Sequence, residues 1–189
     1  MSRFAVIFLV VLTACSGNSQ GPPSNIDNAC AIKRDRPAWF RAMNKTERRW
    51  GAPVHVQLAT FYQESSFRPK AKTPRKWFLG FIPAGRVSSA YGYAQAIDGT
   101  WDWYRKDTGR RGAKRHNFYD ASDFMGWYMA RSTQELGIPP NDAYNHYLAY
   151  HDGHNGYARG TYRRKAWLQN TAAKVQSRAA RYQSQLMSC

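Results

Sequence analysis

Glycine and proline divide the chain after residue 30 into segments whose apolar residues recur at helical spacing. One such segment places Val54, Leu58 and Phe61 on the same face of a helix, and Gly51 and Pro53 separate it from the segment before. The predicted helices span 38–50, 54–65, 101–108, 120–136, 143–150 and 163–186. With no convincing series of strands between them, these segments predict a mainly α-helical domain.

The segment 68–90 interrupts this pattern, because it shows no periodicity and carries prolines and glycines among aromatic residues. Long loops in compact domains are usually functional or disordered, and the aromatic content argues against disorder. We expect a long loop or a small hairpin here. Two interpretations of 77–82 remain open: a flap over a substrate cleft, and an insertion that packs on the core.

The first fourteen residues are typical of a secretory signal peptide. Arg3 supplies the positive start, and 4–12 form an apolar run too short to span a bilayer as a helix. Leu-Thr-Ala then precedes Cys15 in a stretch that resembles a bacterial lipobox, which implies lipidation of Cys15; an ordinary signal peptide with an incidental cysteine is the alternative. We expect a lipidated N-terminus and flexible tether over 15–29, and a folded domain over 30–189.

This N-terminus implies a location on the periplasmic side of the cell envelope, with the lipid held in the outer membrane. In such an oxidising compartment, the two remaining cysteines are expected to pair. Cys30 and Cys189 stand at opposite ends of the expected domain. We therefore predict a disulfide that joins the two ends, against the alternative of two unrelated thiols.

The formal net charge of +16 favours anionic partners. Carboxylates of peptidoglycan stem peptides and anionic lipid head groups suit a secreted chain better than nucleic acid does. No nucleic-acid recognition motif is found, so no nucleic-acid partner is expected. Charge alone does not choose between the remaining partners.

Glu64 stands out among the three glutamates of the chain. On a helical wheel it lies about 100° from the apolar stripe of 54–62, at the boundary between core and solvent. The negative end of the helix dipole and the aromatic neighbours both raise a carboxyl pKa. A carboxylic acid that stays protonated near neutral pH can protonate the leaving oxygen of a glycosidic bond. An ordinary boundary carboxylate remains the alternative at this point.

Three segments in order resemble the motifs of lytic transglycosylases with a goose-lysozyme-like fold, over about residues 50–160. The first resembles the family's Glu-Ser at the end of the catalytic helix, the second its Gly-Leu-Met-Gln stretch, and the third its Ala-Tyr-Asn. These segments are Glu64-Ser65-Ser66-Phe67, Tyr91-Gly92-Tyr93-Ala94-Gln95 and Ala149-Tyr150-His151. The resemblance implies a mainly α, lysozyme-like fold with a substrate cleft and a small loop or hairpin region.

The resemblance also implies an activity and a site. Peptidoglycan glycan strands would be cleaved without water, one carboxylate would suffice, and 1,6-anhydromuramyl ends would form. No cofactor or metal is implied, and we expect a monomer. In the implied roles Glu64 is the catalytic acid and base, Ser65 bonds near it or to a sugar, Gln95 and the backbone of Ala94 hold sugar groups, and Tyr150 places its hydroxyl close to Glu64. His151 stands where the family has a substrate-contacting asparagine, so this contact differs here.

Alternative functions remain open from the sequence. A lysozyme-type hydrolase would need a second carboxylate, and Asp152 is the aspartate least easily explained by a helix cap or first turn. A non-catalytic envelope protein could bind peptidoglycan through the same residues. The cluster His146, His151, Asp152 and His154 contains metal-ligand types, but its spacing matches no known metal motif, and we expect no metal there.

Overall fold

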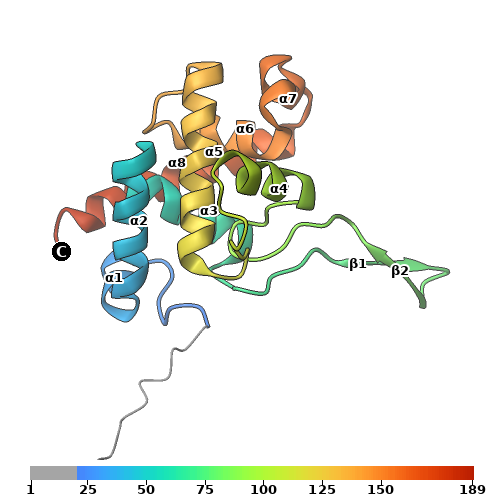
Figure 1. Ribbon diagram of the computed structural model, residues 1–189, viewed down its shortest axis with the longest axis horizontal. Helices are drawn as coiled ribbons and strands as arrows, with labels where there is room; N and C mark the ends of the chain where they lie inside the picture. The colour runs from blue at the N-terminus through green and yellow to red at the C-terminus, as the bar shows by residue number, and fades with distance from the viewer. Residues whose placement is uncertain (1–20) are drawn as a thin grey trace, which may run out of the picture.

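The computed structural model describes residues 21–189; the expected signal peptide, the lipidation of Cys15 and the first part of the tether lie outside the described residues. Within the described part, helices dominate and one two-stranded sheet is present, which confirms the predicted fold class (Figure 1). The elements are α1 (Ala29–Asp35), α2 (Pro37–Trp50), α3 (Val54–Ser65), β1 (Arg75–Phe78), β2 (Ile82–Arg86), α4 (Asp98–Asp107), α5 (Phe118–Leu136), α6 (Ala143–Asp152), α7 (His154–Ala158), the 3₁₀ helix η1 (Thr161–Arg164) and α8 (Ala166–Leu186).

The ends of the helices follow from local chemistry. The side chain of Asn117 accepts from the first backbone N–H groups of α5, and Asp142 does the same for α6. Gly51 and Gly137 end α2 and α5 in the left-handed conformation that glycine adopts most readily. The predicted helices are therefore found within a few residues of their expected bounds. The short helices α1 and α7 were not predicted; α7 lies between the helices predicted over 143–150 and 163–186.

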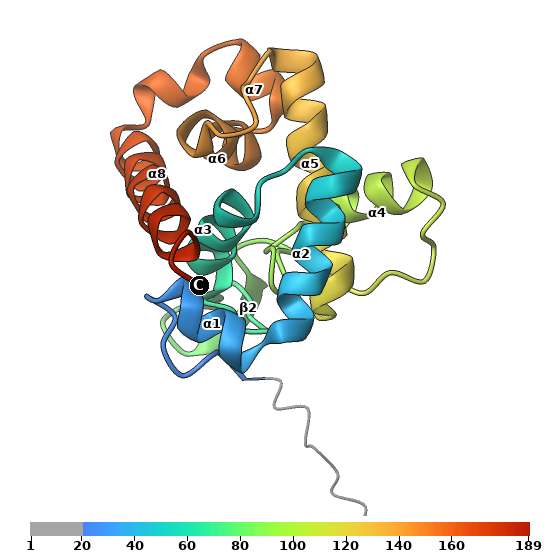
Figure 2. The same cartoon turned by 90° about the vertical axis from the view of Figure 1, so that its left-hand side faces the viewer.

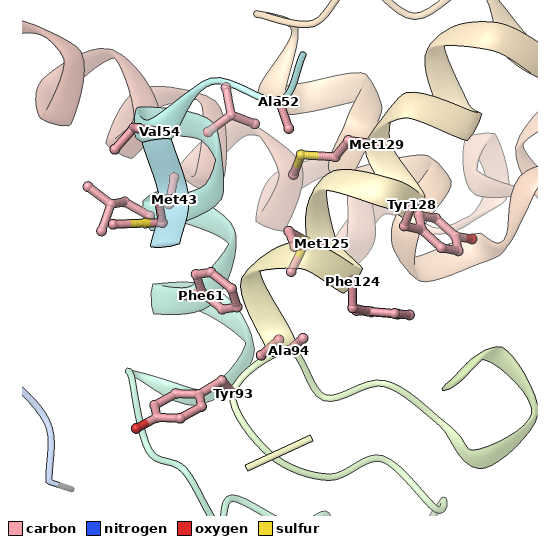
Figure 3. Close-up of a cluster of buried hydrophobic side chains, with 14 of the residues drawn as sticks. Met43, Ala52, Val54, Phe61, Tyr93, Ala94, Phe124, Met125, Tyr128 and Met129 are labelled. Carbon is pink, nitrogen blue, oxygen red and sulfur yellow. The ribbon is translucent and has the colours of Figure 1, made fainter. Parts of the chain in front are cut away.

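The core forms around α5, which contacts α2, α3, α4, α6 and α7, while α8 packs on α3 and α6 (Figures 1 and 2). Figure 3 shows Met125 of α5 near Phe61 of α3, in one cluster with Met129, Met43 and Val54. Phe61, Met43 and Met125 are fully buried. Burial of such side chains, each contributing about 1.5–3 kcal/mol, fixes how α3 sits against the rest of the domain.

A buried carboxylate ties α4 and α2 to α5. Asp123 accepts hydrogen bonds from the Tyr104 hydroxyl at 2.7 Å and the Trp50 indole N–H at 3.0 Å. Arg49 and Arg110 form ion pairs with it at 3.1 and 2.9 Å. The sequence placed this residue in the first turn of a helix that starts at 120, but α5 begins at Phe118 and the side chain points into the protein. Its many donors explain how the charge is accommodated there.

The two ends of the domain meet, and the predicted disulfide is confirmed. Cys30 in α1 is bonded to Cys189, 159 positions later. The segment before Cys30 also contacts the helices: both the backbone N–H and the hydroxyl of Ser24 donate to Asp35, and Asp27 pairs with Arg178 of α8 at 2.6 Å. Residues 24 and 27, which the sequence assigned to the tether, therefore contact the helices of the domain.

The segment 68–90 contains an antiparallel hairpin of β1 and β2, with Phe78 opposite Ile82 and Trp77 opposite Pro83. Every residue of both strands is exposed, and the hairpin extends away from the helical body (Figure 1). The interpretation of 77–82 as an insertion packed on the core is therefore wrong. Nor does the hairpin lie over α3 and α6 as a flap, because it points outward. Within residues 21–189 no helix combines the length and the hydropathy needed to cross a membrane.

Candidate active site

Glu64 lies in the last turn of α3, immediately before a sharp change of chain direction. Ser66 and Phe67 both adopt positive φ angles, 49° and 60°, which are unusual for residues with side chains. The Phe67 ring is fully buried and stacks on Trp39 with centroids 5.8 Å apart, so core packing stabilises this turn. The end of α3, and with it the Glu64 side chain, is thereby held in one position.

The surroundings of Glu64 favour its protonated form. Its side chain is half-buried, and removal from water raises the pKa of the carboxyl group from 4.5 to about 7, a rise that a hydrogen-bonding interaction with Tyr147 partly offsets. Near neutral pH this carboxyl group is therefore present in both protonation states. Such a group can give a proton and then take one back, as general acid–base chemistry requires.

Two tyrosines of α6, three positions apart and on the same helix face, lie near Glu64. Tyr147 is buried, and burial together with the Glu64 charge raises its pKa well above 10, so its hydroxyl stays a donor. Burial also raises the pKa of Tyr150, with Glu64 contributing. The Tyr150 hydroxyl, however, donates to the carbonyl of Ala94.

The expectation that the Tyr150 hydroxyl lies close to Glu64 stays a prediction, because the Glu64 charge acts on both tyrosines, and Tyr147 is the one that forms a hydrogen-bonding interaction with Glu64. Sequence reasoning missed Tyr147. Tyr147 stands three positions before Tyr150 in the helix predicted over 143–150, and this spacing, which places both on one helix face, could have identified it.

The loop that carries the second motif is held by its own polar groups. The side-chain amide of Gln95 donates to the carbonyls of Ala71 and Gly92 at 3.0 and 2.8 Å, and the carbonyl of Ala94 accepts from Tyr150. The roles expected for Gln95 and Ala94 were contacts with sugar groups. Those contacts stay a prediction, and the bonds that the structure shows connect the 91–97 loop to the chain after α3 and to α6.

Gly92 is the position in this loop where only glycine fits. Its φ is +81°, and a Cβ built on it would lie 2.2 Å from the carbonyl oxygen of Arg115. We predict that Gly92→Ala displaces the loop from 115, lowers the free energy of unfolding by about 2–4 kcal/mol and reduces activity. Gly99→Ala is the matched control, since nothing lies within 4 Å of a Cβ there. Equal melting temperatures for the two variants in a thermal unfolding experiment would contradict the prediction.

The contact expected for Ser65, with the catalytic carboxyl group or a sugar, stays a prediction. Its side chain is buried, and the hydroxyl donates to the carbonyl of Phe61 at 3.3 Å, one turn earlier in α3. A bond of this kind satisfies a buried hydroxyl inside a helix. The Ser65 contact that the structure shows is therefore one within α3.

His151 and Asp152 end α6 and lie in different surroundings. The exposed ring of His151 meets Trp167 of α8 edge to face, with centroids 4.9 Å apart. The Asp152 side chain is buried and accepts from Lys165 and Thr161; burial alone would raise its pKa, but these donors bring it below 3.8. Asp152 is thus an ion-pair partner that connects α6 to η1 and the start of α8.

The other two histidines of the cluster considered in the sequence, His146 and His154, also lie in different surroundings. His154 contacts Ser132 and Glu135 at 2.9 and 3.0 Å, whereas His146 is buried, which lowers its pKa to about 4. Among residues 21–189 the structure brings no three His, Cys, Asp or Glu side chains together as metal ligands.

The surface beside the site is basic. One depression is lined by residues 68–72, which directly follow the α3 turn and include Arg68, Lys70 and Lys72. A second is lined in part by Lys72, Arg86 and Arg115. Anionic groups of a ligand bound near Glu64 would meet these cations.

Comparison with known proteins gave one finding. A family model described as transglycosylase SLT domain matches residues 3–189. A search of curated proteins found no match to the chain.

Proposed function

The chain belongs to the transglycosylase SLT domain family, whose members act on peptidoglycan, and from this premise we propose that it is a lytic transglycosylase with Glu64 as its catalytic acid and base. The bond cleaved is the β-1,4 bond between N-acetylmuramic acid and N-acetylglucosamine. The product carries a 1,6-anhydro-N-acetylmuramic acid end. The observation that carries the proposal is a carboxyl group at the end of α3 whose pKa is raised to about 7.

The proposed reaction uses Glu64 twice. The protonated carboxyl group first donates its proton to the glycosidic oxygen, and the bond to C1 of the muramic acid breaks. The resulting carboxylate then accepts the proton of the C6 hydroxyl group of the same sugar, whose oxygen bonds to C1. No water is consumed, and Glu64 ends in the protonated state in which it began. The Tyr147 hydroxyl supports this cycle because it stabilises the carboxylate between the two steps.

The state of Asp152 supports a mechanism with one carboxylate. A retaining hydrolase needs a second carboxyl group about 5 Å from the acid, and an inverting one needs a base about 6.5–9.5 Å away. Asp152, the aspartate that the sequence left as the candidate, already accepts bonds from Lys165 and Thr161. A base engaged by two donors is poorly suited to activate water.

The charge distribution supports the same substrate. Stem peptides of peptidoglycan carry carboxylates, and the depression lined by 68–72 offers three cations close to the end of α3. We further propose that the N-terminal segment is removed, that Cys15 is lipidated, and that the enzyme acts as a monomer on the periplasmic side of the outer membrane. The apolar run followed by Leu-Thr-Ala-Cys supports this location.

The mass of the released muropeptides distinguishes a transglycosylase from a lysozyme. We predict that the wild type releases muropeptides one water lighter than those of a lysozyme, and that no heavy oxygen enters them in labelled water. Asp152→Asn should keep substantial activity with the same products, because the amide can still accept from Thr161. Mass spectrometry of digested sacculi makes the measurement. Products that contain the label, together with an inactive Asp152→Asn enzyme that unfolds at the wild-type temperature, would establish a hydrolase.

A further inference from the structure

The tip of the β1–β2 hairpin exposes an unusual amount of apolar surface. Trp77 is 54% exposed, Phe78 61%, Leu79 69%, Phe81 70% and Ile82 43%. Phe78 lies opposite Ile82 at the turn between β1 and β2, and Figure 1 shows the hairpin of these two strands extending away from the helices. Scattered apolar residues are normal on a protein surface, but a contiguous patch of this kind marks a site of interaction.

The turn of the hairpin presents this patch outward. Leu79 adopts a φ of 51° and Gly80 one of 80°, and the backbone N–H of Phe81 donates to the carbonyl of Phe78 at 3.3 Å. The tight turn directs Leu79 to the extreme tip. Within residues 21–189 no element packs over these side chains.

The charges around the tip are all positive. Between Glu64 and Asp98 the sequence has no acidic residue and six basic ones. Three of these, Arg75, Lys76 and Arg86, lie in the two strands themselves, and among the described residues no carboxylate forms an ion pair with them. The hairpin therefore combines an apolar tip with a cationic stem.

We propose that the hairpin tip inserts into the surface of an anionic phospholipid bilayer, with the basic residues of the strands facing the lipid phosphates. Aromatic and aliphatic side chains with flanking Lys and Arg are the composition that binds the membrane interface. A second copy of the chain fits less well, because two cationic stems would repel each other. A glycan fits less well because the side chains of 77–82 offer one hydrogen-bonding group, the Trp77 N–H.

Insertion at this point also orients the catalytic site. The hairpin begins at Arg75, ten residues after α3 ends, and the intervening chain is fastened to the 91–97 loop through the bonds of Ala71 with Gln95 and Gly92. A bilayer that holds the tip therefore fixes the direction from which Glu64 faces the glycan.

Flotation with lipid vesicles tests the proposal. The probe is a fragment of residues 21–189, which contains the whole described core and the disulfide. Vesicles contain either phosphatidylcholine alone or a mixture with phosphatidylglycerol. We expect the fragment to float with the anionic vesicles, and Phe78→Ser/Phe81→Ser to reduce its partition coefficient by about tenfold or more. Tyr119→Ser/Met187→Ser, which removes two exposed apolar residues elsewhere, should leave the coefficient unchanged.

A second variant separates insertion from charge attraction. Arg75→Gln/Lys76→Gln/Arg86→Gln should weaken binding and its salt dependence, while brominated lipid should still quench the Trp77 fluorescence of the bound fraction. Equal flotation of the tip variant and the wild type, or concentration-dependent dimers that the tip variant abolishes without any lipid binding, would overturn the proposal.

The outcome is independent of the catalytic assignment. Digestion of sacculi in lipid-free solution should proceed at the wild-type rate in Phe78→Ser/Phe81→Ser. A slow reaction there with unchanged vesicle binding would make the hairpin a glycan contact and overturn the membrane role. An enzyme inactive with or without the tip, but bound to vesicles only with it, would reject the proposed function and leave the membrane role standing.

Discussion

Glu64→Gln should reduce cleavage of sacculi by about 100- to 10,000-fold, the range that a general acid contributes. The amide keeps the shape of the side chain but carries no transferable proton. Release of soluble muropeptides gives the measurement, and Glu47→Gln serves as the matched control because Glu47 lies in α2, outside the site. A loss of less than tenfold would contradict the assignment and favour another acid, whereas a wild type without cleavage activity would favour a peptidoglycan-binding protein.

The same substitution should stabilise the protein at alkaline pH. The pKa of Glu64 is raised from 4.5 to about 7 in the folded state, so between these values the folded protein holds a proton that the unfolded chain loses. Stability therefore falls as pH rises through this window, and above pH 7 the folded state carries the whole cost of a half-buried charge.

The expected magnitude follows from this shift. Each tenfold change in acidity corresponds to about 1.4 kcal/mol, and partial contact with water reduces the total to about 2–3 kcal/mol. Denaturant unfolding at pH 5 and pH 8 should thus show that the free energy of unfolding of Glu64→Gln increases relative to that of the wild type as pH rises. A difference that stays constant between the two pH values would show that the carboxyl group titrates normally. Activity should in turn decline above pH 7, where the acid form is lost.

Local chemistry explains how much of the fold the sequence predicts. Helix ends are set by residues such as Asn117, Asp142 and Gly137, whose effects act within one turn, so helices could be placed within a few residues. The short α1 and α7 could not be placed. They are too short to show a periodic stripe, and α1 is stabilised by α8 and the disulfide, which are distant in sequence.

The site was predictable to the extent that it follows from one helix. Glu64 could be identified because its place at the end of α3 is a property of that helix. The partners of Tyr150, Gln95 and Asp152 could not, because each is chosen by a loop or helix that tertiary packing brings near: Ala94, Ala71 and Lys165. A motif therefore locates the chemistry, whereas the direction of each hydrogen bond depends on the assembled fold.

Removal of the disulfide is expected to produce the largest loss of stability. The bond closes a loop of 159 positions, for which the chain-entropy relation gives about 5 kcal/mol. That amount is comparable to the total stability of many domains. Denaturant unfolding of Cys30→Ser/Cys189→Ser measures the loss. Reductant should destabilise the wild type and leave the variant unaffected, because the described residues contain no other cysteine.

The activity expected of the variant depends on whether the disulfide acts on the folded state or on the unfolded chain. In the folded state the ends are also held by other contacts: the backbone N–H of Ala29 donates to Gln185 at 2.8 Å, and Arg178 pairs with Asp27 at 2.6 Å. Loss of the covalent bond should therefore leave the native packing of α1 on α8 and act mainly by freeing the unfolded chain.

Since Glu64 and Tyr147 lie on α3 and α6, the variant should digest sacculi at the wild-type rate well below its melting temperature. It should lose activity only as it unfolds. Reduced activity in a fully folded variant, or a change in unfolding free energy below 1 kcal/mol, would show instead that the bond acts on the native structure or hardly constrains the unfolded chain.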